Sequence, residues 1–233
     1  ITEPWLAEEL LENDKADICM IGRANLCEPE FCNKAQAGHE EDIRPCIGCL
    51  RCLNGIMFGK RVACTVNPSL EPENEDTITP AKETKNVLVI GGGPAGMEAA
   101  YVAAKRGHHV VLADRQDSLG GTVRIAAVPI AKQDLTQLIK YQAHKLEQAG
   151  VKVLLNTEVT LETIQKDYPD YEGILCAGAT PVVPQFMTQF KDWMTADDVL
   201  YGRKFPERKI VVIGGGSVGC ETADYLAPDL KDR

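Results

Sequence analysis

Residues 87–100, VLVIGGGPAGMEAA, form the stretch that decides the fold. A short apolar run leads into glycines spaced G-x-G-x-x-G, at Gly91, Gly93 and Gly96, and a helix-forming run follows. The first glycine allows a tight turn, the second lets the backbone approach a pyrophosphate, and the third lets the helix pack on the strand. The stretch therefore predicts an α/β domain in which Pro94 and Ala95 open a helix that faces a dinucleotide.

The residues after this helix supply the context that the glycine loop needs. HVVLADR, residues 109–115, predicts a second strand ending in Asp114, which lies twenty-one residues after Gly93. An acidic residue at that distance is placed to hydrogen-bond the ribose of an adenosine. We assign Asp114 and the adjacent Arg115 to the nucleotide site. A glycine loop with a purely structural role is the alternative.

The same pattern of an apolar strand, a glycine loop and a helix recurs in IVVIGGGSVGCETA, residues 210–223, about 120 residues later, and it predicts a strand at IVVI. Two such loops separated by a strand-rich segment favour a flavin domain with a nicotinamide domain inserted in it. The second loop supplies three glycines to the nicotinamide site: Gly214, Gly216 and Gly219. Two further segments, LGG and the domain crossover CAGATP, add backbone groups to the flavin site: Gly120, Gly121, Thr122, Ala177 and Gly178.

Four of the nine cysteines lie together upstream of the first loop. Cys46, Cys49 and Cys52 are separated by two-residue gaps, and Cys64 follows after eleven residues. Three bunched thiolates and one distant thiolate favour a [4Fe-4S] cluster. Zinc is the alternative, although structural zinc sites more often pair two Cys-x-x-Cys knuckles. We predict that the other cysteines act as small hydrophobic residues: Cys19, Cys27, Cys32, Cys176 and Cys220.

The N-terminal region, residues 1–45, has the pattern of one turn of a parallel α/β structure. Apolar residues at positions 5, 6, 10 and 11 lie on one helical face, and ICMI, residues 18–21, predicts a short buried strand that ends at Gly22. One such turn cannot complete a barrel, so we expect the remainder of that domain upstream, outside this chain. Residues 69–85 are polar and contain two prolines, which predicts a linker.

Composition narrows the classes of partner. The formal net charge of −9 disfavours a nucleic acid or an anionic membrane surface as partner, because either would require a basic patch. No apolar run approaches the roughly 18 residues of a membrane span. Disulfides are typical of exported proteins, and no secretory signal pattern is visible here. We therefore expect the cysteines to be free thiols or metal ligands. We expect a cytoplasmic homo-oligomer acting on a small-molecule substrate.

These motifs, in the order IRPCIGCLRCLNG, ACTVNP, VLVIGGGPAGMEAA, LGG, CAGATP and VVIGGGSVGCETA, resemble the iron–sulfur flavoenzymes of the old yellow enzyme group. That family includes 2,4-dienoyl-CoA reductase, 2-enoate reductase and trimethylamine dehydrogenase. The resemblance implies a TIM barrel with FMN, a cysteine loop with the cluster, and a module for FAD and NAD(P)H. It also implies that Gly22 and Arg23 bind the FMN phosphate, although a surface salt bridge is an alternative for Arg23.

The resemblance divides the chain into five parts: 1–45, the end of the barrel; 46–68, the cysteine segment; 69–85, the linker; 86–205, the FAD domain; and 206–233, the start of the NAD(P) domain. It implies that electrons pass from NAD(P)H through FAD, the cluster and FMN to an activated C=C bond. We expect no turnover from this chain alone, because the remaining barrel and nicotinamide parts of the parent chain are missing.

Two departures leave alternatives open. The two-residue gap between Cys49 and Cys52 matches trimethylamine dehydrogenase, whereas dienoyl-CoA reductases have three residues there. Asp114 occupies a position where the family usually has the longer Glu. The cysteine gap favours the first alternative, an amine dehydrogenase with ADP in place of FAD, whereas the intact second fingerprint, IGGGSVG, favours the reductase. A non-enzymatic zinc- and nucleotide-binding electron-transfer module is the second.

Overall fold

The computed structural model describes residues 1–70, 78–206 and 209–227. The centre of the molecule is a parallel sheet with the strand order β3-β2-β1-β4. Its four strands are β1 (Asn86–Ile90), β2 (His109–Ala113), β3 (Lys152–Leu154) and β4 (Tyr171–Leu175). The α/β class and the strands predicted around the first glycine loop are confirmed.

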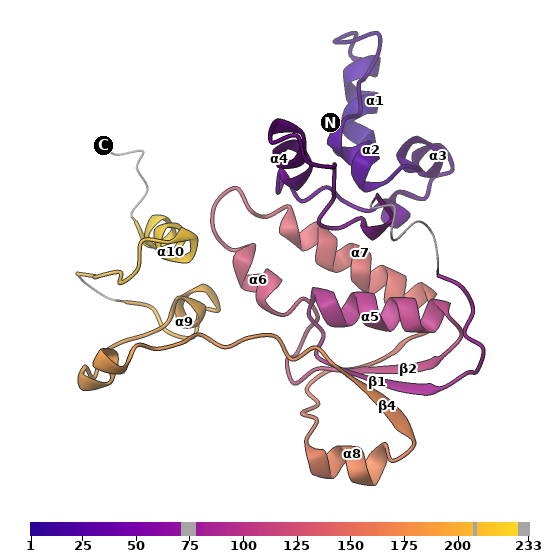
Figure 1. Cartoon of the computed structure of the whole chain (residues 1–233). Coiled ribbons are helices and arrows are strands. Elements are labelled where there is room, and N and C mark those ends of the chain that lie inside the picture. The colour runs from indigo at the N-terminus through magenta and orange to yellow at the C-terminus, as the bar shows by residue number, and fades with distance from the viewer. Residues whose placement is uncertain (71–77, 207–208, 228–233) are drawn as a thin grey trace.

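Helices cover both faces of this sheet, as parallel strands require. Helices α5 (Pro94–Lys105) and α7 (Leu135–Gln148) lie on one face and α8 (Leu161–Asp167) on the other (Figure 1). The short helix α6 (Thr122–Ala126) precedes α7. None of the helices in the described part of the chain is long and apolar enough to cross a membrane.

Side chains alternate between the two faces of β1 and β2 because successive residues of a strand point in opposite directions. Val89 and Leu112 pack into the core under α5 and α7, where Met97 joins them. Leu88 and Val111 point to the opposite face and form a second cluster near α8. The two apolar faces hold β1 at the centre of the sheet, and the glycine loop begins where β1 ends.

The N-terminal segment carries only short helices, and it lies against α7 (Figure 1). Its elements are α1 (Pro4–Glu12), α2 (Arg23–Cys27), α3 (Phe31–Gln36), η1 (Glu40–Asp42), α4 (Arg51–Met57) and η2 (Pro68–Leu70). The predicted helix near the N-terminus is present as α1. The strand predicted at residues 18–21 is wrong. Ile18 and Met20 are 85% and 88% exposed, and no described strand lies beside them to supply the ladder hydrogen bonds.

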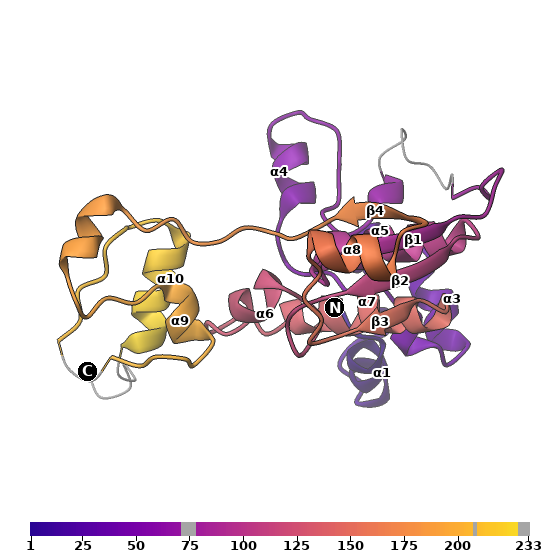
Figure 2. The ribbon, with the colours of Figure 1, turned by 90° about the horizontal axis from the view of Figure 1, so that it is seen from below.

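The C-terminal region forms a separate group of elements beyond β4, joined to it by an extended segment (Figure 2). It contains η4 (Gln185–Gln189), α9 (Ala196–Leu200) and α10 (Ser217–Leu226). The strand predicted before the second glycine loop does not form. Residues 209–213 have no described partner strand, and Val211 is 84% exposed. Part of the predicted linker, residues 71–77, lies outside the described residues.

Candidate functional site

The first glycine loop connects β1 to α5 in a conformation that only glycine tolerates at two positions. Gly91 has a φ of +111°, and a Cβ built there would lie 2.2 Å from the carbonyl oxygen of Cys176. A Cβ at Gly96 would lie 1.8 Å from the carbonyl oxygen of Gly91. These contacts explain the spacing of the fingerprint, because the turn and the helix approach each other at backbone distance.

Gly93 differs from the other two glycines of the fingerprint. A Cβ built there would meet nothing closer than the Cα of Gly121, at 4.0 Å. Gly93 precedes α5, and no side chain caps that helix. The N-terminal N–H groups of an uncapped helix attract an anion such as a phosphate. The space that is open at Gly93 therefore suits a pyrophosphate.

The LGG segment lies directly beside this opening. The N–H of Gly120 donates to the carbonyl of Gly92 at 2.8 Å, and Gly121 lies against Gly93. Gly120 and Gly121 have φ values of +111° and +51°, and Thr122 begins α6. This segment, which the motif predicted to be part of the flavin site, lies beside the first loop.

Asp114 follows β2 and lies under the same loop. Its carboxylate accepts hydrogen bonds from the N–H groups of Gly92 and Gln116, the latter at 2.7 Å. Only 9% of Asp114 is exposed. A carboxylate has about four acceptor sites, so two backbone bonds leave capacity for ribose hydroxyls. The neighbouring Arg115 is exposed.

The glycine loop, Asp114, the LGG segment and the crossover segment thus meet at the carboxyl ends of the parallel strands. The crossover segment contributes through Cys176 and Ala177, whose backbone lies against Gly91, and Gly178 follows with a φ of +72°. Sequence reasoning did not identify Gln142 of α7. The Nε2 of Gln142 donates to the carbonyl of Pro94 at 3.3 Å, while its buried Oε1 has no hydrogen-bond partner.

The second glycine loop repeats the geometry of the first. Gly214 has a φ of +116°, and a Cβ built at Gly219 would lie 1.9 Å from the carbonyl oxygen of Gly214. A Cβ at Gly216 would meet nothing within 4 Å, as at Gly93. The turn therefore forms here even though no described strand pairs with residues 210–213. An ion pair of 2.6 Å between Lys132 and Glu221 connects α10 to the loop before α7.

The cysteine segment does not form an assembled metal site. Among the described residues, no three His, Cys, Asp or Glu side chains are arranged to hold a metal ion. All nine cysteines are free thiols. The two ends of the segment nevertheless approach each other, because the Cys49 Sγ lies 3.1 Å from the Thr65 hydroxyl, next to Cys64.

Cys64 is in an environment that favours the thiolate. Hydrogen bonding with Cys27 lowers the pKa of Cys64 to about 6, and the backbone N–H groups of Val66 and Asn67 contribute to this shift. The same contact raises the pKa of Cys27, which is buried and donates to the carbonyl of Pro45 at 3.2 Å. Burial of Cys27 agrees with its predicted role as a small hydrophobic residue.

Cys176 is half-buried and packs against the core cluster of the sheet, in agreement with the prediction. Cys19 is half-buried, whereas Cys32 and Cys220 are exposed and differ from the prediction. Cys32 lies on α3 and Cys220 on α10, so neither is part of the core around the sheet. Gly22 and Arg23, which the resemblance assigned to an FMN phosphate, are both exposed at the start of α2.

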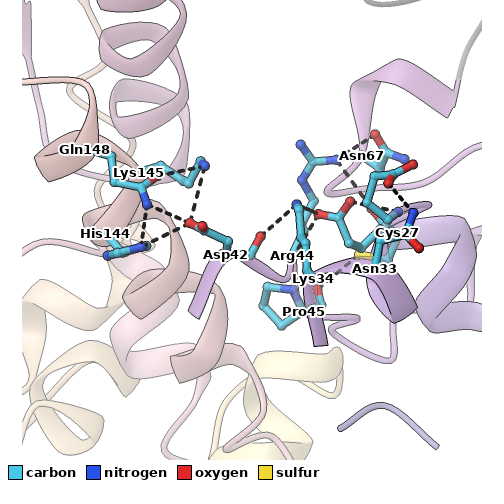
Figure 3. Close-up of polar contacts among 12 residues, drawn as sticks. Cys27, Asn33, Lys34, Asp42, Arg44, Pro45, Asn67, His144, Lys145 and Gln148 are labelled. Carbon is cyan, nitrogen blue, oxygen red and sulfur yellow. Dashed lines mark hydrogen bonds and ion pairs between the residues drawn. The ribbon is translucent and has the colours of Figure 1, made fainter. Parts of the chain in front are cut away.

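A buried polar network holds the ends of the cysteine segment together (Figure 3). The Arg44 Nη1 donates to the Asn67 Oδ1 at 2.7 Å and to the carbonyl of Cys27 at 3.3 Å. Asn67 is 1% exposed, and its Nδ2 donates to the carbonyl of Leu26 at 3.0 Å. Glu28, also buried, pairs with Lys34 at 2.6 Å. The sequence motifs did not single out Arg44, Asn67 or Glu28, although Arg44 lies two residues before Cys46 and Asn67 three residues after Cys64.

A second set of contacts joins the N-terminal segment to α7 (Figure 3). The Asp42 carboxylate lies 3.1 Å from the His144 Nε2 and accepts from the Gln148 Nε2 at 2.7 Å. Lys145 is 3.7 Å from the same oxygen. Burial next to this contact raises the pKa of Tyr141 to about 12. These contacts set the position of the cysteine segment relative to the helix that packs on α5.

The fold and the first loop together define a dinucleotide-binding domain of the flavoprotein oxidoreductase type. The chain belongs to the pyridine nucleotide-disulphide oxidoreductase family, whose profile matches residues 85–229. It is 40% identical to an NADH oxidase of Thermoanaerobacter brockii over 97% of this chain and 36% of that protein. It is 36% identical to a cinnamate reductase of Clostridium sporogenes over 99% of this chain and 34% of that protein.

A solved structure of a 2-naphthoyl-CoA reductase complex matches with a TM-score of 0.91 and 32% identity, over 97% of this chain and 34% of that one. The relatives are oxidoreductases of the group that the sequence resembles, so the predicted relationship to the old yellow enzyme group is confirmed. The chain spans about a third of the length of the proteins that it matches.

Proposed function

We propose that this chain is the part of a multi-cofactor reductase that binds FAD and links it to an iron–sulfur cluster. In the whole protein, electrons would pass from NAD(P)H through FAD, the cluster and FMN to an activated C=C bond. The names of the relatives, an NADH oxidase, a cinnamate reductase and a 2-naphthoyl-CoA reductase, support a reductase of this kind. FAD supplies the chemistry that converts transfer of an electron pair into transfer of single electrons.

The single observation that carries this proposal is the convergence of four segments around the opening at Gly93. The uncapped start of α5 and the backbone of Gly121 would bind the pyrophosphate. Asp114 would accept hydrogen bonds from the adenosine ribose while its backbone contacts keep the carboxylate in place. The crossover at Ala177 and Gly178 would border the flavin side of the site.

The donor set of the cysteine segment fits a cluster by its chemistry. Four free thiols are available, one of them with a depressed pKa, and the ends of the segment already lie close together. Cys46, Cys49, Cys52 and Cys64 would hold the cluster after a local rearrangement brings the four sulfurs together. Thiolate ligation of iron is typical of such spacing. Free cysteines also suit a reducing compartment such as the cytoplasm.

Four further parts of the proposal concern the whole protein. Gly22 and Arg23 would contribute to an FMN phosphate site completed by barrel residues, and Gly214, Gly216 and Gly219 would contribute to the NAD(P)H site. The substrate would be a small molecule with an activated alkene. We also propose a homo-oligomer.

The experiment that tests the proposed FAD site is a titration of the purified chain with FAD, followed by flavin fluorescence, and a parallel titration with ADP. We expect saturable binding of FAD with one site per chain and competition by ADP. Tight binding of ADP without any additional affinity for FAD would support the amine dehydrogenase alternative. Absence of binding by either nucleotide would contradict the proposal.

A further inference from the structure

Arg44 connects the two ends of the cysteine segment to each other. It precedes Cys46 by two residues, and Asn67 follows Cys64 by three. Its Nη1 bonds the Asn67 Oδ1 at 2.7 Å, so a side chain from one end of the segment fixes a buried side chain from the other. Nη1 belongs to a rigid planar guanidinium, whose donor geometry the ammonium group of a lysine does not reproduce.

The same guanidinium reaches the two structural units on either side of the segment. It donates to the carbonyl of Cys27 at 3.3 Å, at the end of α2 (Figure 3), and it lies 5.8 Å from the ring centroid of Tyr141 on α7. Helix α7 also packs on α5, the helix that begins at the glycine loop. One side chain thus touches α2, the far end of the cysteine segment and the nucleotide domain.

The charge of Arg44 is permanent. It lies at the Cys64 end of the segment, because the Arg44 Nη1 bonds Asn67, three residues after Cys64, at 2.7 Å. The buried Glu28 carboxylate accepts from the backbone N–H of Arg44 at 3.3 Å, and Lys34 balances its charge at 2.6 Å. Arg44 therefore supplies positive potential to the surroundings of Cys64. A fixed positive charge stabilises the reduced form of a neighbouring redox centre, which raises its reduction potential. Net charge and hydrogen bonds set the potentials of iron–sulfur clusters.

We propose that Arg44 is a positioning residue for electron transfer: it fixes the ends of the cysteine segment against the nucleotide domain, and its charge raises the reduction potential of the centre bound there. The second half of this statement rests on the proposed iron–sulfur function, whereas the first half concerns contacts of the protein alone. The two halves can therefore be tested separately.

The test compares three variants of the full chain: Arg44→Gln, Arg44→Lys and Arg61→Gln. Arg61 is the matched control, because it lies in the same segment and is exposed. Hydrogen–deuterium exchange of the metal-free chain reports on the first half. We expect Arg44→Gln to accelerate exchange at residues 43–46 and 66–69 together, and Arg61→Gln to leave both regions unchanged. Equal exchange rates in Arg44→Gln and Arg61→Gln would overturn the positioning role.

The potential of the iron-loaded chain, measured by redox titration with electron paramagnetic resonance, reports on the second half. We expect a more negative midpoint potential in Arg44→Gln and a potential near that of the unsubstituted chain in Arg44→Lys, which keeps the charge but loses the planar guanidinium. A potential that is unchanged in Arg44→Gln would overturn the electrostatic role.

Two further outcomes keep the halves distinguishable. If Arg44→Gln fails to fold, we expect Arg44→Lys to accelerate amide exchange at residues 43–46 and 66–69. Unchanged exchange in Arg44→Lys would then refute the positioning role. Failure of the unsubstituted chain to bind iron and sulfide would refute the proposed function and the electrostatic role, and the exchange result would still decide the positioning role.

Discussion

The glycines of one fingerprint have two different tasks. At Gly91 and Gly96 a Cβ would collide with the backbone at 2.2 and 1.8 Å, whereas at Gly93 a Cβ would meet nothing closer than 4.0 Å. Gly93 also has φ −74° and ψ 178°, a conformation open to any L-residue. The fold therefore requires the first and third glycines, whereas we propose that ligand binding requires the second.

Gly93→Val should separate binding from stability. Its side chain would enter the space that we assign to the pyrophosphate, so we expect FAD affinity to fall at least about tenfold, or about 1.4 kcal/mol. The free energy of unfolding should change by no more than about 0.5 kcal/mol, as for substitutions without steric conflict. Fluorescence titration and urea unfolding measure the two quantities.

Gly96→Ala is the matched comparison, and it should lose about 1–3 kcal/mol of stability because its Cβ overlaps the Gly91 carbonyl. Equal FAD affinity in the unsubstituted chain and in Gly93→Val would contradict the assignment of the opening. A large loss of stability in Gly93→Val would show that its surroundings are packed rather than open.

Asp114 combines a structural and a binding task. In Asp114→Ala the N–H groups of Gly92 and Gln116 lose their acceptor, which should cost about 1–3 kcal/mol of unfolding free energy. FAD affinity should fall as well, because the ribose loses its acceptor. Asp114→Glu serves as a control, since it keeps the carboxylate. An Asp114→Ala variant with full FAD affinity would remove Asp114 from the binding site.

At the scale of secondary-structure elements, the contact of η1 with α7 depends on one carboxylate. Partial burial raises the pKa of Asp42, but the hydrogen bond from Gln148 and the charges of Lys145 and His144 outweigh it and hold that pKa below its usual range. Because the folded-state pKa is depressed, the contact contributes stability above the unfolded pKa. That contribution is lost as the pH falls through the folded value.

We therefore expect η1 to loosen from α7 below about pH 4, near the ordinary pKa of an aspartate. Amide exchange at residues 40–45 as a function of pH measures this loosening. Asp42→Asn retains an acceptor for Gln148 but cannot ionise, so its exchange in this region should depend less on pH over the same range. An identical pH profile in both proteins would show that another group controls the contact.

The sequence predicted the strands that lie within the sheet and failed for two that lie outside it. β1 and β2 are apolar runs with partners on both sides, so the pattern and the pairing agree. ICMI and IVVI have equally apolar patterns, but a strand also needs a lateral partner, and none of the described strands is beside residues 18–21 or 210–213. The second glycine loop forms regardless, because its geometry depends on local backbone contacts between Gly214 and Gly219.

At the scale of the whole molecule, sequence motifs predicted which segments carry the nucleotide site, and the structure brings those segments together. The motifs could not predict the polar contacts that join the cysteine segment to the rest of the chain. Arg44, Asn67 and Asp42 have no characteristic spacing, since their partners lie at unrelated positions on α2 and α7. Such contacts depend on the packing of elements, which a local pattern does not contain.

The central claim is that a flavin site and an iron–sulfur site lie on this one chain, and the most direct measurement is cofactor analysis of the chain purified without oxygen. Iron, acid-labile sulfide, zinc and flavin are determined per chain on a single sample. The account predicts about four iron, about four sulfide and one FAD, with loss of iron and sulfide in Cys64→Ala and retention of both in Cys32→Ala. Stoichiometric zinc without sulfide, or a chain that takes up neither iron nor flavin, would contradict it.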